Sequence, residues 1–91
     1  MNDIDIKSKI KAYIVSQLDG FDDFAYHDNL VDMGILTDDF IFALIQFLEK
    51  NFAVKIYKQE LYKTFSINSI GKLISNKMKS SQSSQKIMVN V

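Results

Sequence analysis

The first hydrophobic pattern along the chain is that of an amphipathic helix. Apolar side chains recur every three or four residues from Ile6 to Leu18, which places them on one helical face. Asp3 precedes this stripe and suits the positive end of a helix dipole, and Gly20 follows it and suits a helix C-terminus. The pattern predicts a helix over residues 4–18 whose buried face comprises Ile6, Ile10, Tyr13, Ile14 and Leu18.

A second pattern predicts a helix over residues 38–52. Thr37 is a good N-cap because its hydroxyl can accept from an unpaired backbone N–H, and Asp38 and Asp39 meet the positive end of the dipole. The body of this helix is apolar nearly all round. Such a helix is either central to the core or exposes part of its apolar surface to a partner.

Shorter signals complete an all-α prediction. Residues 53–56 read as an extended link, residues 57–63 as a brief helix, and Ser66 as the cap of a last helix over 67–78. The inner stripe of the last helix comprises Ile67, Ile70, Leu73, Ile74 and Met78. The fold expected is a small four-helix bundle, with three main helices, one short helix and a long loop after the first helix.

The predicted loop over residues 19–37 is long for a compact domain, and such loops are often functional. Together with the helix start it holds seven aspartates and no lysine, which suits either a solvated loop or attraction to a basic partner. Calcium is not favoured, because the EF-hand alternation and its closing Glu are missing. Apolar residues within the loop indicate that it is pinned to a core: Phe21, Phe24, Tyr26, Leu30, Val31, Met33, Ile35 and Leu36.

Length and composition indicate one domain over residues 1–78 and a disordered polar tail over 79–91. The chain has 91 residues and is 47% apolar, an ordinary value for a globular protein. Its zero net charge hides an asymmetry, since residues 1–49 carry −7 and residues 50–91 carry +7. The basic residues are all lysines without a recognition motif, so solubility explains them better than nucleic-acid binding.

Several site chemistries are excluded or disfavoured. The chain has no Cys, and its three glycines are too far apart for a phosphate-binding loop. His27 beside Asp28 has no nucleophile or second ligand nearby, so a surface or loop-anchoring role is expected and no metal site. The chain has no run of 18 apolar residues, so no membrane span is predicted. The polar N-terminus does not suit a signal peptide, and the expected location is therefore the cytoplasm. We expect a binding or carrier module rather than an enzyme.

The middle of the chain resembles the acyl carrier and peptidyl carrier proteins. The resemblance covers about residues 4–78 and includes Phe65-Ser66-Ile67 at the entry to the last helix. Its central motif is Leu30-x-x-x-Gly34-Ile35-Leu36, a polar triplet, then Phe42-x-Leu44-Ile45-x-x-Leu48-Glu49-x-x-Phe52-x-Val54-x-Ile56. The resemblance implies a flexible 4'-phosphopantetheine arm, attached to a serine in Asp-Ser-Leu, that carries a thioester between active sites.

The attachment serine is absent here. Counting from either side of the motif, Thr37 stands at the family Asp, Asp38 at the Ser and Asp39 at the Leu or Met. An aspartate offers no hydroxyl for the phosphodiester, so the chain as written carries no phosphopantetheine at position 38. The hydroxyl of Thr37 is the nearest one, but helix capping explains it better. Asp38 is either an engineered Ser→Asp change, with phosphopantetheine on the parent protein, or the mark of a natural carrier-like domain that lost its arm.

The resemblance also implies a docking surface on the 38–52 helix. The partners would be biosynthetic enzymes of an acyl, aminoacyl, polyketide or nonribosomal type, or a phosphopantetheinyl transferase. The residues expected to dock are Thr37, Asp39, Phe42, Ala43, Gln46, Glu49 and Lys50. Phe42 could equally be a core residue; if it is exposed, docking would be more hydrophobic than electrostatic. The alternative function is an unmodified carrier-like scaffold or regulator that binds such enzymes without cargo.

Overall fold

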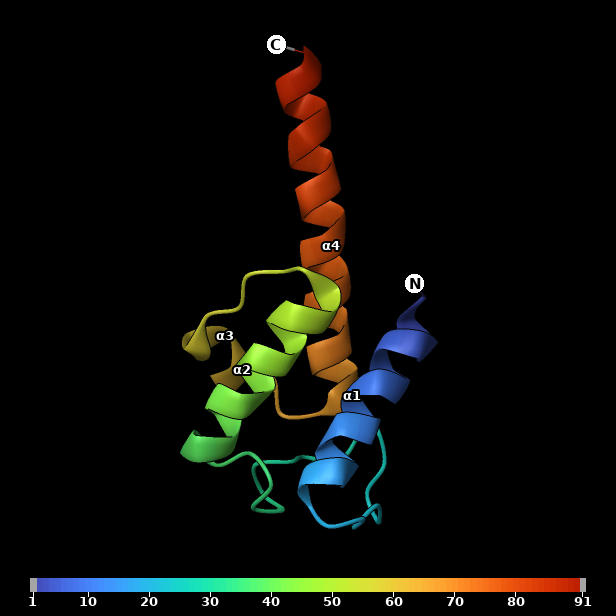
Figure 1. Ribbon diagram of the computed structural model, residues 1–91, viewed down its shortest axis with the longest axis vertical. Coiled ribbons are helices and arrows are strands. Elements are labelled where there is room, and N and C mark those ends of the chain that lie inside the picture. The colour runs from blue at the N-terminus through green and yellow to red at the C-terminus, as the bar shows by residue number, and fades with distance from the viewer. Residues whose placement is uncertain (1, 91) are drawn as a thin grey trace.

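The computed structural model describes residues 2–90, with side chains for residues 2–79. Over that part the chain forms four helices and no strand: α1 (Asp3–Gln17), α2 (Asp38–Phe52), α3 (Lys58–Tyr62) and α4 (Ile67–Asn90). Figure 1 shows α1 and α2 on either side of the lower part of α4, with α3 beside α2 and the long loop beneath. The predicted all-α bundle of three main helices and one short helix is confirmed.

The predicted helix bounds hold closely for the first three helices. The bounds of α2 match the prediction, and those of α1 differ by one residue at each end. The last helix begins at Ile67, as predicted, and the Ser66 hydroxyl accepts from the Ser69 N–H at 3.2 Å.

The last helix ends later than the sequence pattern predicts. It continues to Asn90 rather than ending near residue 78, because neither Gly nor Pro follows Gly71 to interrupt it. The tail predicted over 79–91 lies almost wholly outside the residues whose side chains are described, and its disorder stays a prediction.

The core lies where α1, α2 and α4 meet. Each helix contributes a stripe at intervals of three or four residues, which is the spacing of one helical face. Tyr13 and Leu18 of the predicted first stripe are half-buried, as are Leu73 and Met78 of the last. The buried helix side chains are Ile6, Ile10, Ile14, Ile41, Leu44, Leu48, Phe52, Leu61, Ile67, Ile70 and Ile74.

The long loop is pinned to the bundle, as its apolar residues predict. The Leu30 N–H donates to the Phe65 carbonyl at 2.6 Å, and the Asn68 N–H donates to the Tyr26 carbonyl at 3.0 Å. The Leu30 carbonyl accepts from the N–H groups of Ile35 and Leu36, which closes the turn leading into α2. The buried side chains of the loop are Phe24, Leu30, Ile35 and Leu36.

The end of α2 is strained at Ala53. This residue caps the helix with φ of 53° and ψ of 43°, a left-handed conformation that glycine adopts more readily. We expect Ala53→Gly to raise the free energy of unfolding by about 0.5–1 kcal/mol, after allowing for the greater entropy of unfolded glycine. Urea denaturation measures this change in the free energy of unfolding. The matched change Ala43→Gly, inside α2, should instead lower stability by about 1 kcal/mol. Destabilisation by both would refute the relief of strain.

Candidate functional site

The start of α2 holds Thr37, Asp38 and Asp39, the three residues that the resemblance aligns with the attachment triplet of carrier proteins. The Thr37 hydroxyl accepts from the Phe40 N–H at 3.3 Å, which confirms its role as N-cap. Asp38 and Asp39 follow in the first turn, and both side chains are exposed. Their charges therefore stabilise the helix by facing the positive end of its dipole.

Asp38 makes a specific contact with α3. The Tyr62 hydroxyl donates to Asp38 Oδ1 at 2.6 Å, a short hydrogen bond to a carboxylate. Beside it, the Lys58 ammonium lies 4.8 Å from the ring centroid of Phe42 and 5.5 Å from that of Tyr62. Four side chains thus tie the first turns of α2 to α3, and the carboxylate at position 38 has a structural partner that a serine, one atom shorter, would hold less well.

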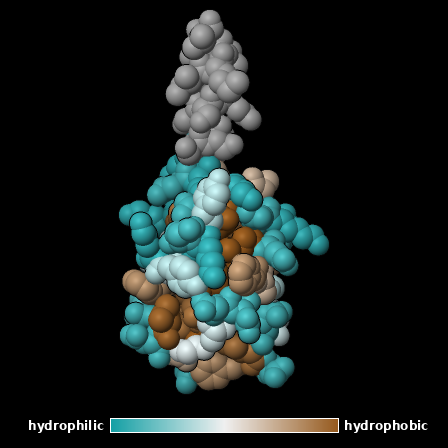
Figure 2. Space-filling view, turned by 90° about the vertical axis from the view of Figure 1, so that its left-hand side faces the viewer, coloured by the Kyte–Doolittle hydropathy of each residue, from teal (hydrophilic) through white to brown (hydrophobic). Residues whose placement is uncertain are grey.

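Phe42 is exposed, so the alternative that places it in the core is wrong. Its side chain is 56% exposed, while its neighbours Ile41 and Leu44 are buried. Two other aromatic residues on the α3 side, Tyr57 and Tyr62, are exposed as well. Figure 2 faces this side of the molecule and shows hydrophobic patches separated by hydrophilic side chains. We name the surface formed by Asp38, Phe42, Lys58 and Tyr62 the α2–α3 surface.

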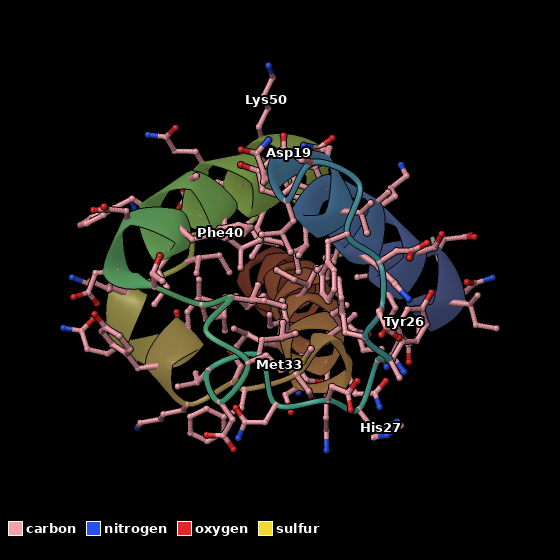
Figure 3. The ribbon with its side chains drawn as sticks, turned by 90° about the horizontal axis from the view of Figure 1, so that it is seen from below. Asp19, Tyr26, His27, Met33, Phe40 and Lys50 are labelled. Atoms are coloured by element: carbon pink, nitrogen blue, oxygen red, sulfur yellow. The ribbon has the colours of Figure 1, made fainter. Side chains whose placement is uncertain are left out.

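Three other expected docking residues lie on the opposite flank of α2. Ala43, Gln46 and Lys50 line an open groove of about 360 Å³ between α2 and α1. The groove includes Tyr13 and Phe47, whose rings stack with centroids 4.2 Å apart. Figure 3 shows Lys50 pointing away from the bundle into solvent. The structure therefore divides the expected docking residues between two flanks of one helix.

Glu49 is engaged within the chain. Its Oε2 accepts from the Ile56 N–H at 2.9 Å and lies 3.8 Å from the Lys55 ammonium. These contacts fold the extended link back onto the end of α2. The negative charge that the resemblance assigns to docking at this position is therefore partly neutralised by Lys55.

Polar contacts within the chain hold the acidic loop in place. Asp28 Oδ2 accepts from the Ala25 N–H at 2.6 Å, and the Lys11 ammonium donates to the Phe24 carbonyl at 2.7 Å. His27 Nε2 lies 3.6 Å from Asp28 Oδ1, but its side chain is 78% exposed and points outward in Figure 3. Within residues 2–79, no group of three or more metal-ligating side chains comes together.

A second ion pair ties α3 to α4. Glu60 accepts from the Lys77 ammonium at 2.9 Å and from the Tyr57 N–H at 2.9 Å. Burial acts to raise the pKa of Glu60, but the hydrogen bonds from Lys77 and Tyr57 and the charge of Lys77 outweigh it, so this pKa lies below its ordinary value of 4.5.

Replacing this carboxylate tests the contact. Because the folded-state pKa is lowered, its contribution is present above pH 4.5 and is lost as the pH falls through the folded value. Glu60→Gln should therefore lower the free energy of unfolding at pH 7 by less than about 1 kcal/mol, since about a third of the side chain is exposed. Urea denaturation at pH 7 and pH 3 measures this. A difference from the parent chain that is as large at pH 3 would contradict the electrostatic origin.

Sequence reasoning missed Lys58 and Tyr62, the α3 residues that complete the α2–α3 surface. They lie four residues apart on one face of α3, but nothing in their spacing indicates contact with the first two turns of α2, which come much earlier in the chain. The order of the elements alone does not fix which face of so short a helix meets α2. The packing of Leu61 into the core and the contact of Glu60 with Lys77 orient the helix.

The comparisons with known proteins add no relative. Comparison of the chain with models of protein families, with curated proteins and with solved structures gave no match.

No helix within the described residues is long and apolar enough to cross a membrane.

Proposed function

We propose that this chain is a non-catalytic, acyl carrier protein-like module of an acyl, aminoacyl, polyketide or nonribosomal type of biosynthetic pathway. It docks partner enzymes through α2, and as written it carries no phosphopantetheine at position 38. The observation that carries the proposal is the exposure of Phe42 in the second turn of α2, beside the position where the family has its serine. An exposed phenylalanine held among charged groups is the composition expected of an interface anchor. A cytoplasmic location goes with this proposal, because such enzymes are expected there.

One observation favours the unmodified scaffold over a blocked carrier. The Tyr62 hydroxyl donates a hydrogen bond to Asp38 Oδ1 at 2.6 Å, so the aspartate helps to hold α3 against α2. A residue introduced only to block attachment would need no such partner. The second candidate function is therefore a carrier-like regulator that binds the enzymes of a carrier pathway without cargo.

Intact mass after incubation with a phosphopantetheinyl transferase and coenzyme A tests the carrier resemblance. We expect no mass gain for the chain as written and a gain of one arm for Asp38→Ser, because the transferase would meet the same docking helix. A gain on the chain as written would contradict the assignment of position 38 as the attachment site. No gain on Asp38→Ser would contradict a carrier surface and leave the cargo-free regulator.

The same assay tests Phe42 as the anchor. In the Asp38→Ser background, Phe42→Ala should slow arm transfer about tenfold, the effect of a modest interface hot spot. Gln17→Ala, at an exposed residue of α1 that is not among the expected docking residues, is the control and should change the rate less than twofold. Equal effects of the two changes would refute the anchor role of Phe42.

A further inference from the structure

A pocket whose lining residues are all polar or charged lies between α1 and α4, and no residue of α2 or α3 lines it. Its volume is about 380 Å³. Three lysines line it, Lys7 from α1 and Lys72 and Lys79 from α4, together with a single acid, Asp3. This pocket is separate from the surfaces considered so far, so its role does not depend on the proposed docking function.

The three lysines are not neutralised by neighbouring acids. Among the described residues, Lys55 and Lys77 form ion pairs with glutamates, but Lys7, Lys72 and Lys79 form none. With Asp3 included, the pocket carries an excess of positive charge. Charges of one sign gathered in a concave site raise the local concentration of ions of the opposite sign.

The backbone of α4 is adapted to hold Lys7 at this pocket. Gly71 is buried in the interior of α4, where glycine is a poor helix former. A Cβ at this position would lie 3.0 Å from Cγ of Lys7, and the next nearest atoms belong to the same side chain. The stem of Lys7 therefore crosses α4 at its one residue without a side chain, which restricts where the ammonium can lie.

The remaining lining residues can hydrogen-bond an anion. Asn68, Ser75 and Asn76 supply amide and hydroxyl groups around the lysines. Lysine is a compact point charge with three donors, and it binds phosphate oxygens as a point charge rather than through a planar fork. The lining therefore offers positive charge and hydrogen-bond donors to an anion.

We propose that this pocket binds a diphosphate group. The pocket, at about 380 Å³, has room for a single phosphate or a diphosphate. The three ammonium groups from two helices favour the more highly charged diphosphate. Either free diphosphate or the diphosphate of a larger ligand has this chemistry.

Titration of the labelled protein with inorganic diphosphate, followed by amide NMR shifts, tests the proposal. We expect saturable shifts at Asn68, Ser75 and Asn76, weakened by added salt. Lys72→Gln with Lys79→Gln should weaken binding about tenfold, the effect of losing two partly exposed charge contacts. Both lysines are exposed, so the double variant should fold.

The matched control removes two exposed lysines outside the pocket, Lys9→Gln with Lys63→Gln, and so makes the same change in net charge. It should change the affinity less than twofold. Asp3→Asn should have the opposite sign and tighten binding about threefold, because it removes the opposing carboxylate.

Three results would overturn the proposal: shifts that do not saturate, equal losses in the pocket and control variants, or binding of citrate as tight as that of diphosphate. ADP distinguishes the two sources of the anion. Displacement of diphosphate by ADP supports a ligand that carries the group, and absence of displacement supports the free anion.

Discussion

Leu30→Ala should lower the free energy of unfolding by about 3 kcal/mol, within the range for large-to-small changes at a buried leucine. Leu30 is fully buried in the turn that precedes α2, and its N–H and carbonyl anchor that turn to Phe65, Ile35 and Leu36. Loss of the side chain leaves a cavity where the loop meets the core. A domain of this size has a total stability of about 5–14 kcal/mol, so the effect is a large share.

Urea denaturation measures this change, and Val31→Ala is its matched control. Val31 is the next residue but lies largely exposed, so its truncation should cost less than about 0.5 kcal/mol. A similar loss for the two variants would show that the loop is not anchored through Leu30. Retention of full stability by Leu30→Ala would show the same.

Leu61→Ala should lower stability by about 2–4 kcal/mol and release α3 from the bundle. The helix has five residues, too few to persist without tertiary contacts, and Leu61 is its one buried side chain. Amide hydrogen exchange should therefore quicken over residues 58–63 more than in α1 or α4. In the Asp38→Ser background, loss of α3 should also slow arm transfer, because Lys58 would no longer lie against Phe42.

Tyr62→Phe separates the anchoring of α3 from its hydrogen bond to Asp38. It removes the donor at 2.6 Å but keeps the ring, so a cost of about 1 kcal/mol or less is expected. If Tyr62→Phe were as destabilising as Leu61→Ala, the hydrogen bond rather than core packing would hold α3. Uniform exchange across all helices in Leu61→Ala would contradict local release.

The elements that sequence could predict are those determined by local chemistry. Thr37 with two following aspartates marks the start of α2, and the start of α4 at Ser66 follows from the same kind of cap. The burial of Leu30 was also predictable in kind, since a long loop rich in apolar residues must cover a core. The end of α4 was not, because a polar stretch without Gly or Pro gives no local stop signal.

The candidate site was less predictable because it depends on contacts between elements. A helix apolar on nearly every side does not indicate which face is covered, so the pattern left Phe42 undecided between core and surface. The hydrogen bond from the Ile56 N–H to Glu49 forms only because the extended link after α2 turns back along that helix. The approach of Lys7 to Gly71 needs the crossing of α1 and α4, which no local spacing encodes.

The two backbone hydrogen bonds that pin the loop have a consequence for the order of folding. Each joins residues far apart in the chain, Leu30 with Phe65 and Tyr26 with Asn68, so each requires closure of a long segment. On the far side, the Phe65 carbonyl lies just before α4 and the Asn68 N–H lies in its first turn. The loop should therefore become ordered only after the last helix has begun to form, and a nascent chain that ends before residue 65 should hold α1 and α2 without a fixed connection between them.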